Sequence, residues 1–181
     1  MPFIKHILSI SPRNFELAVK GILDASGATL TSYESKHLEP LVGQDGEYII
    51  DVVARFSALG AVFVVLIECK HHKRKVERHD VQVLHSKVTS TGAHKGMLFS
   101  VSGFQSGAIQ YADNHGIALV QLAAGSTSWF TKSLGPETPA PPFASIPDYI
   151  GWWHHDTYMS LVSEQFGEYT LNALGLASNE P

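Results

Sequence analysis

The sequence has little cysteine, no long apolar run and no excess of positive charge. One cysteine in 181 residues excludes an internal disulfide, so a reducing cytoplasm is the simplest setting. The longest uninterrupted apolar run, AVFVVLI at 61–67, is far shorter than the roughly 18 residues that indicate a membrane span. The N-terminal MPFIKHILSI shows no secretory signal. A net charge of −4 gives no general attraction to nucleic acid or to an anionic membrane, so any such attraction must be local.

Positive charge is concentrated in one short stretch that follows the apolar run. Five of the 13 lysines and arginines lie between positions 70 and 78 and are opposed only by Glu77. A basic run of this kind is either a solvated loop that leads into a helix or a surface that binds phosphates. We predict the second, with nucleic-acid contacts from Lys73, Arg74, Lys75 and Arg78.

Hydrophobic periodicity and turn residues predict an α/β protein. Helical spacing is found in 11–27, in 81–91 before Gly92 and in 108–115 before Gly116. Runs rich in β-branched and aromatic residues predict strands, at 28–35, 47–56, 61–69, 96–101 and 117–122. A strand, helix and strand at this spacing form a crossover with parallel pairing. The expected fold is therefore one mixed sheet flanked by helices, in the order α-β-β-β-α-β-α-β.

A change of composition near position 136 divides the chain. Five prolines fall between 136 and 147, which predicts a Pro-rich linker or an extended surface segment. We therefore expect one domain over 1–135. Residues 136–181 form a Pro-rich segment and a short aromatic C-terminal extension, expected to contain a helix or two that pack on the domain or on a partner.

Two acidic residues occur where their apolar neighbours imply burial. Asp51 lies within the strand IIDVVA and Glu68 ends the next strand, and neighbouring strands run about 4.8 Å apart, so the two carboxylates can converge. Two carboxylates this close require a proton or a cation between them, and Mg²⁺ prefers oxygen ligands. Side-chain alternation places Lys70 on the same face as Glu68. The backbone carbonyl of Cys69 is a further possible metal ligand.

The same three side chains also allow a plainer interpretation, as a salt bridge at the ends of two surface strands. A buried carboxylate without a cation or a donor is costly, and this favours a metal site. Lys70 beside the metal would orient or help activate the attacking water and offset charge on phosphorus. The pattern predicts metal-assisted hydrolysis of phosphodiester bonds.

The ordered pieces of the chain resemble a known family. FELAVKGILDASG, DGEYIIDVVARF, VVLIECKHHKRKV and the stretch from VQVLHSKV to GIALVQL are similar to the Mrr-like branch of the PD-(D/E)xK restriction-endonuclease superfamily, over roughly 13–122. This resemblance implies the restriction-endonuclease fold and DNA cleavage with Mg²⁺ or Mn²⁺. It also implies roles for five side chains, with metal-binding acids at Asp51 and Glu68, the lysine at Lys70, an acid of the first helix at Glu16 and a helical glutamine at Gln82.

Two positions depart from the pattern of the family without removing a ligand. EYIID stands where Gly-Gly-Ile-Asp is frequent, and Glu-Cys-Lys stands where many Mrr-like members have Gln-x-Lys. The expected function is a Mg²⁺-dependent DNA endonuclease in restriction or defence, and the alternative is an idle module of this fold that binds nucleic acid or a partner protein. Because cutting both strands is simplest with two sites, we expect a homodimer. The 59 residues after position 122 are few for a target reader, which leaves room for a separate recognition partner.

Overall fold

The computed structural model describes residues 8–125, 147–154, 159–165 and 167–176. Its elements, in chain order, are α1 (Pro12–Gly27), β1 (Thr31–Val42), β2 (Glu47–Ala58), β3 (Ala61–Lys70), α2 (Arg78–Thr91), β4 (Lys95–Ser100), α3 (Ser106–Asn114), β5 (Ala118–Ala124), β6 (Tyr149–His154), β7 (Met159–Val162) and α5 (Gly167–Ala173). The first eight elements follow the predicted order, so the predicted fold class is confirmed. None of the helices in these ranges is long and apolar enough to cross a membrane.

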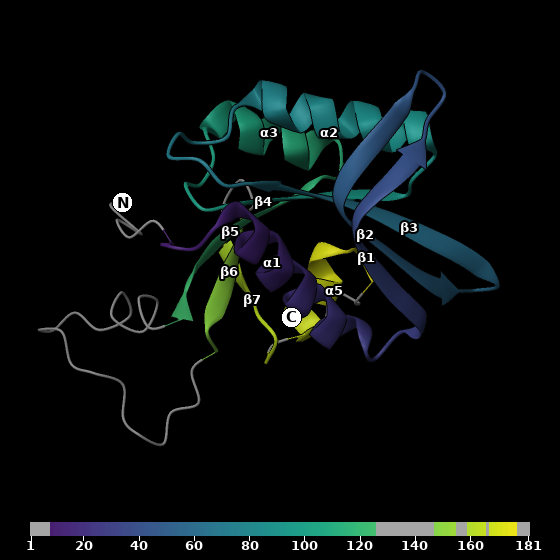
Figure 1. The fold of residues 1–181 in the computed structure, drawn as a ribbon, viewed down its shortest axis with the longest axis horizontal. Helices are drawn as coiled ribbons and strands as arrows, with labels where there is room; N and C mark the ends of the chain where they lie inside the picture. The colour runs from purple at the N-terminus through teal and green to yellow at the C-terminus, as the bar shows by residue number, and fades with distance from the viewer. Residues whose placement is uncertain (1–7, 126–146, 155–158, 166, 177–181) are drawn as a thin grey trace, which may run out of the picture.

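All seven described strands form one mixed sheet, in the order β1-β2-β3-β4-β5-β6-β7. The pairs β1–β2, β2–β3, β5–β6 and β6–β7 are antiparallel, whereas β3–β4 and β4–β5 are parallel. The parallel pairs are those joined through helices α2 and α3, as crossover connections require. Figure 1 shows α2 and α3 on one face of the sheet and α1 and α5 on the other.

Each face of the sheet has its own hydrophobic core. On one face α1 contributes Phe15, Val19, Ile22 and Leu23, which we call the α1 core; on the other, α2 and α3 contribute Val81, Leu84, Ala108 and Ala112, which we call the α2/α3 core. β3 serves both, since Val65 and Ile67 join the α1 core while Leu66 joins the α2/α3 core. This burial on both faces explains why the sequence of β3 does not alternate.

The helix boundaries follow from local chemistry. The side chain of Ser11 accepts a hydrogen bond from the Asn14 amide, and Pro12 occupies the first helical position of α1. At the start of α2 the Glu77 amide donates to the Asp80 carboxylate at 3.0 Å. Gly92 ends α2 with a φ of 70°, a left-handed conformation that glycine adopts without a side-chain clash.

The predicted extent of the first strand was wrong, and part of the C-terminal extension that was expected to be helical is a strand. The first strand begins at Thr31 and runs to Val42 through Pro40, which an edge strand tolerates because one row of its amides has no partner in the sheet. The aromatic segment Tyr149–His154 is a strand that pairs with β5, not a helix. The tyrosine, isoleucine and two tryptophans within this segment are residues that favour strands. A short helix, α5, does follow and packs against α1. The proline-rich stretch 136–146 lies outside the described residues.

Candidate active site

Asp51 lies where β2 and β3 stop pairing as regular strands. The last paired residues are Val52 and Ile67, and beyond them Asp51 Oδ2 accepts a hydrogen bond from the Cys69 amide at 2.7 Å. The alternation of β2 also slips here, because Ile50 packs in the α2/α3 core whereas Val52 packs in the α1 core. Leu38 of β1 lies between His37 and Glu39, the partners of Val52 and Ile50, and has a positive φ of 52°. The irregular backbone thus turns the Asp51 carboxylate toward the end of β3.

The environment of Asp51 disfavours its ionised form. Burial raises the pKa of Asp51 from 3.8 to about 6. The amide of Cys69 opposes this shift, the negative charges of Glu68 and Glu16 add to it, and Lys70 lowers the pKa again. A carboxyl group held in this way gains from a nearby cation, which would stabilise its ionised form.

Glu68 is buried, with 7% of its surface exposed, and lies between two lysines. Lys87 of α2 places its Nζ 2.6 Å from Glu68 Oε1. Lys70 Nζ lies 3.7 Å from Glu68 Oε2, on the same face of β3. The end of β3 therefore brings together the acid and the amine that the sequence pattern paired, and adds a second amine.

The other predicted site residues lie at different distances from this centre. Glu16 of α1 bonds His37 of β1, with Oε2 and Nε2 2.6 Å apart, and its charge acts on Asp51. The side chain of Cys69 packs against the α1 core, and burial raises the pKa of its thiol well above the usual range. Gln82 is exposed on α2 and, within the described residues, makes no hydrogen bond to Asp51, Glu68 or Lys70. The structure therefore groups Glu16, Asp51, Glu68 and Lys70 but leaves Gln82 at the surface.

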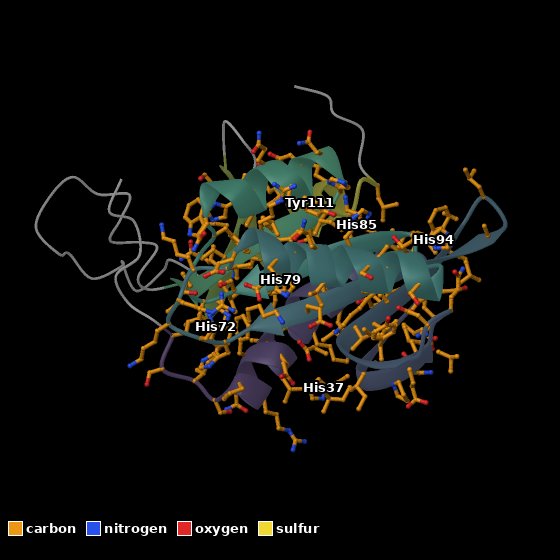
Figure 2. All side chains as sticks on the ribbon, turned by 90° about the horizontal axis from the view of Figure 1, so that it is seen from above. His37, His72, His79, His85, His94 and Tyr111 are labelled. Atoms are coloured by element: carbon orange, nitrogen blue, oxygen red, sulfur yellow. The ribbon has the colours of Figure 1, made fainter. Side chains whose placement is uncertain are left out.

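The basic run occupies the loop between β3 and α2 and the first turn of α2. Lys73, Lys75 and Arg78 are exposed. Arg74 is already paired, with Nη1 3.1 Å from Asp80 Oδ2 and 3.4 Å from Glu77 Oε1. Arg78 places its guanidinium carbon 5.3 Å from the centre of the Tyr111 ring. Figure 2 shows His72 and His79 at this end of α2, whereas His85 lies farther along the helix beside Tyr111.

The sequence did not predict two contacts at the site, that of Lys87 with Glu68 and that of His37 with Glu16. His37 lies on β1 beyond the predicted end of that strand, so its approach to Glu16 of α1 could not be foreseen. Lys87 follows Leu84 by three positions on α2, at the edge of the apolar stripe that faces the sheet. Lys87 lies at the edge of that stripe, on the helix that directly follows the strand with Glu68. This position is the sequence feature from which its contact with Glu68 could have been predicted.

The donor atoms of the site suit a hard divalent cation. Within the described residues, no group of three or more His, Cys, Asp or Glu side chains is placed to hold a metal ion. Mg²⁺ needs only one or two carboxylates together with water and substrate phosphate. Asp51 and Glu68 are the carboxylates at this end of the sheet that could serve as such ligands, and the negative charge of Glu68 adds to the raised pKa of Asp51.

A mixed sheet flanked by helices in this element order is consistent with the fold of restriction-endonuclease-like domains. The Mrr catalytic-domain family model, described as a restriction endonuclease, matches residues 7–124. The chain belongs to this family, and the matched region is a restriction-type nuclease domain. Such domains generally use divalent metal ions and take DNA as substrate.

Comparison with other proteins adds little to this family assignment. No curated protein matches the chain. A crystal structure described as that of a protein of unknown function, AF1548, is 20% identical in sequence, with a TM-score of 0.47. The similar region covers 59% of this chain and 55% of that one, so this chain spans about half of its length.

Proposed function

We propose that this chain is a Mg²⁺- or Mn²⁺-dependent DNA endonuclease that hydrolyses phosphodiester bonds in restriction of, or defence against, foreign DNA. The family membership supports nuclease chemistry. The observation that carries the finer proposal is the position of Asp51 within β2 beside the end of β3, which carries Glu68 and Lys70, with the pKa of Asp51 raised to about 6.

Asp51 and Glu68, with the Cys69 carbonyl, would hold the metal ion. When bound, such an ion polarises a phosphate oxygen and lowers the pKa of a bound water. In the hydrolysis the water oxygen bonds to phosphorus, one P–O ester bond breaks, and the departing oxygen takes up a proton. We assign to the Lys70 ammonium the orientation of the water and the offset of negative charge on the phosphate.

Glu16 and Gln82 take outer roles in this proposal. The bond to His37 fixes Glu16, so its charge acts on the pKa of Asp51 from the α1 side of the sheet. Because Gln82 is exposed on α2, close in sequence to the basic run, we assign it to contact with the DNA backbone rather than to the metal.

We assign DNA binding to the exposed end of the β3–α2 connection. Lys73, Lys75 and Arg78 are exposed there, a few residues beyond Lys70, so DNA phosphates bound to them lie near the candidate site. Arg74 has two acidic partners and contributes less. A homodimer would bring two such sites to one duplex, and a separate partner would supply target recognition.

The proposed activity is tested on supercoiled plasmid, linear duplex and branched DNA, each with millimolar Mg²⁺ or Mn²⁺ and with a chelator. We expect nicked or linear products only when metal is present. Intact DNA on all three substrates in both metals would contradict the proposal.

A second candidate, an idle module that binds nucleic acid without cutting it, is favoured by one observation. Lys87 neutralises Glu68 and the Cys69 amide satisfies one oxygen of Asp51, so much of the polar site is already balanced by the chain itself. Metal-independent DNA binding without cleavage would select this function.

A further inference from the structure

Glu68 already has a cationic partner within the fold. The 2.6 Å contact from Lys87 Nζ to Glu68 Oε1 is a charge-assisted hydrogen bond between two side chains that are largely shielded from water, 18% and 9% exposed. We propose that Lys87 is the resident counter-ion of the metal site: it neutralises Glu68 in the metal-free protein, and a divalent metal ion binds by displacing it. This inference rests on the proposed metal site and concerns what regulates that site.

The geometry separates the role of Lys87 from that of Lys70. Lys70 Nζ stands 3.7 Å from the other oxygen of Glu68, too far for a strong hydrogen bond, so Lys70 keeps donors for water or phosphate. Lys87 lies on α2, which covers the sheet, and its Nζ is within hydrogen-bonding distance of Glu68 Oε1. The lysine of the third strand is thus the weaker partner of Glu68, and the lysine of the helix is the stronger one.

The ammonium group of Lys87 has a second possible interaction partner, the ring of Tyr48, when it leaves Glu68. Its Nζ lies 5.9 Å from the centre of the Tyr48 ring, at the outer limit of a cation–π contact. The Tyr48 hydroxyl donates to Asp45 Oδ1 at 2.8 Å, which holds the ring in position. A small rotation of the Lys87 side chain toward Tyr48 would release Glu68 Oε1 while the charge kept a favourable neighbour.

Displacement has a measurable consequence for metal affinity. A positive charge beside the ligand oxygen repels an incoming divalent cation, and removing that charge makes the net charge of the site around Glu68 and Asp51 more negative. At separations of a few ångströms, loss of one unit charge changes the affinity for a divalent ion on the order of tenfold. The metal affinity of this chain is therefore set below the value that its two carboxylates alone would give.

The test is calorimetric titration of Mn²⁺ into the purified protein near pH 8, without DNA. Lys87→Met should bind Mn²⁺ about tenfold more tightly than the parent, whereas Lys87→Arg, which keeps the charge, should bind like the parent. Lys20→Met is the matched control, because Lys20 makes an equally short 2.6 Å ion pair with Asp24 on α1, away from the site. If Lys87→Met does not fold, Lys87→Gln removes the same charge and keeps a donor for Glu68.

The outcomes distinguish the inference from the proposed function. A parent that binds Mn²⁺, together with a folded Lys87→Met or Lys87→Gln that binds it equally or more weakly, would overturn the counter-ion role and leave the metal site intact. Absence of Mn²⁺ binding in the parent and in the Lys87 variants alike would overturn both. Binding in Lys87→Met alone would support the counter-ion role in its strongest form.

Discussion

Asp51 Oδ2 accepts a hydrogen bond of 2.7 Å from the Cys69 amide, at the point where the regular pairing of β2 and β3 ends. A side-chain carboxylate thus replaces a backbone acceptor for the strand that carries Glu68 and Lys70. This contact ties the position of one acid to the backbone beside the other, so the two are held together by the sheet itself.

The raised pKa of Asp51 predicts a pH dependence of stability. The folded pKa of about 6 exceeds the usual aspartate value of 3.8, so the folded protein favours the protonated acid. Its stabilising contribution is fully present below about pH 4 and is lost as the pH rises through about 6. Because the group is partly exposed, we expect an effect on the order of 1 kcal/mol in the free energy of unfolding.

Asp51→Asn should remove this part of the pH dependence. Asparagine keeps an oxygen that can accept the Cys69 amide but carries no charge. Urea unfolding of parent and variant between pH 4 and pH 8, without metal, measures the difference. The free energy of unfolding of the variant should increase relative to that of the parent as the pH rises. If the two free energies change in parallel with pH, the pKa of Asp51 is not raised in the folded protein.

The roles assigned to Glu68 and Lys70 predict separate losses of activity. Glu68→Gln should abolish metal-dependent cleavage, and Lys70→Met should lower its rate by on the order of 10²-fold or more, since one oriented cationic donor is removed. Cleavage rates on plasmid, with circular dichroism to verify folding, provide the measurement. If both variants cut as fast as the parent, the site lies elsewhere.

The basic run predicts unequal contributions to DNA binding. Lys73→Gln and Lys75→Gln should each weaken binding across sequences and reduce the slope of log affinity against log salt by about 1. Arg74→Gln should have a smaller effect, because Glu77 and Asp80 already neutralise that side chain.

Binding of a short duplex in a salt series measures these slopes. Lys36→Gln is the control, since Lys36 is an exposed lysine on the edge strand β1, outside the basic run. Equal slopes in the parent, Lys73→Gln and Lys75→Gln would make the run a solvated surface.

Periodicity and turn residues predicted most of the fold because they report local preferences. The order from α1 to β5, the buried character of β3 and the end of α2 at Gly92 all have local causes. The extent of β1 and the place of β6 in the sheet depend also on neighbouring strands. Pro40 is tolerated because β1 is an edge, and the strand-favouring residues of Tyr149–His154 form β6 by pairing with the open side of β5.

The candidate site divides in the same way between local and long-range information. Glu68 and Lys70 share one strand, so alternation was enough to place them on one face. Asp51 required knowledge that strands β2 and β3 are neighbours, which their sequence order favoured. Lys87 contacts Glu68 from α2 and His37 contacts Glu16 from the distal half of β1, and both contacts depend on how those elements pack.

The most direct test of the metal site is a melting measurement that needs no substrate sequence. A ligand that binds only the folded state stabilises it by RT ln(1 + [L]/Kd), roughly 1.4 kcal/mol at ten times Kd. Millimolar Mn²⁺ near pH 8 should therefore raise the Tm of the parent by a few degrees and leave Asp51→Asn unchanged, with and without a short duplex present. A parent Tm that does not respond to Mn²⁺ in either condition, in a well-folded protein, would contradict the account.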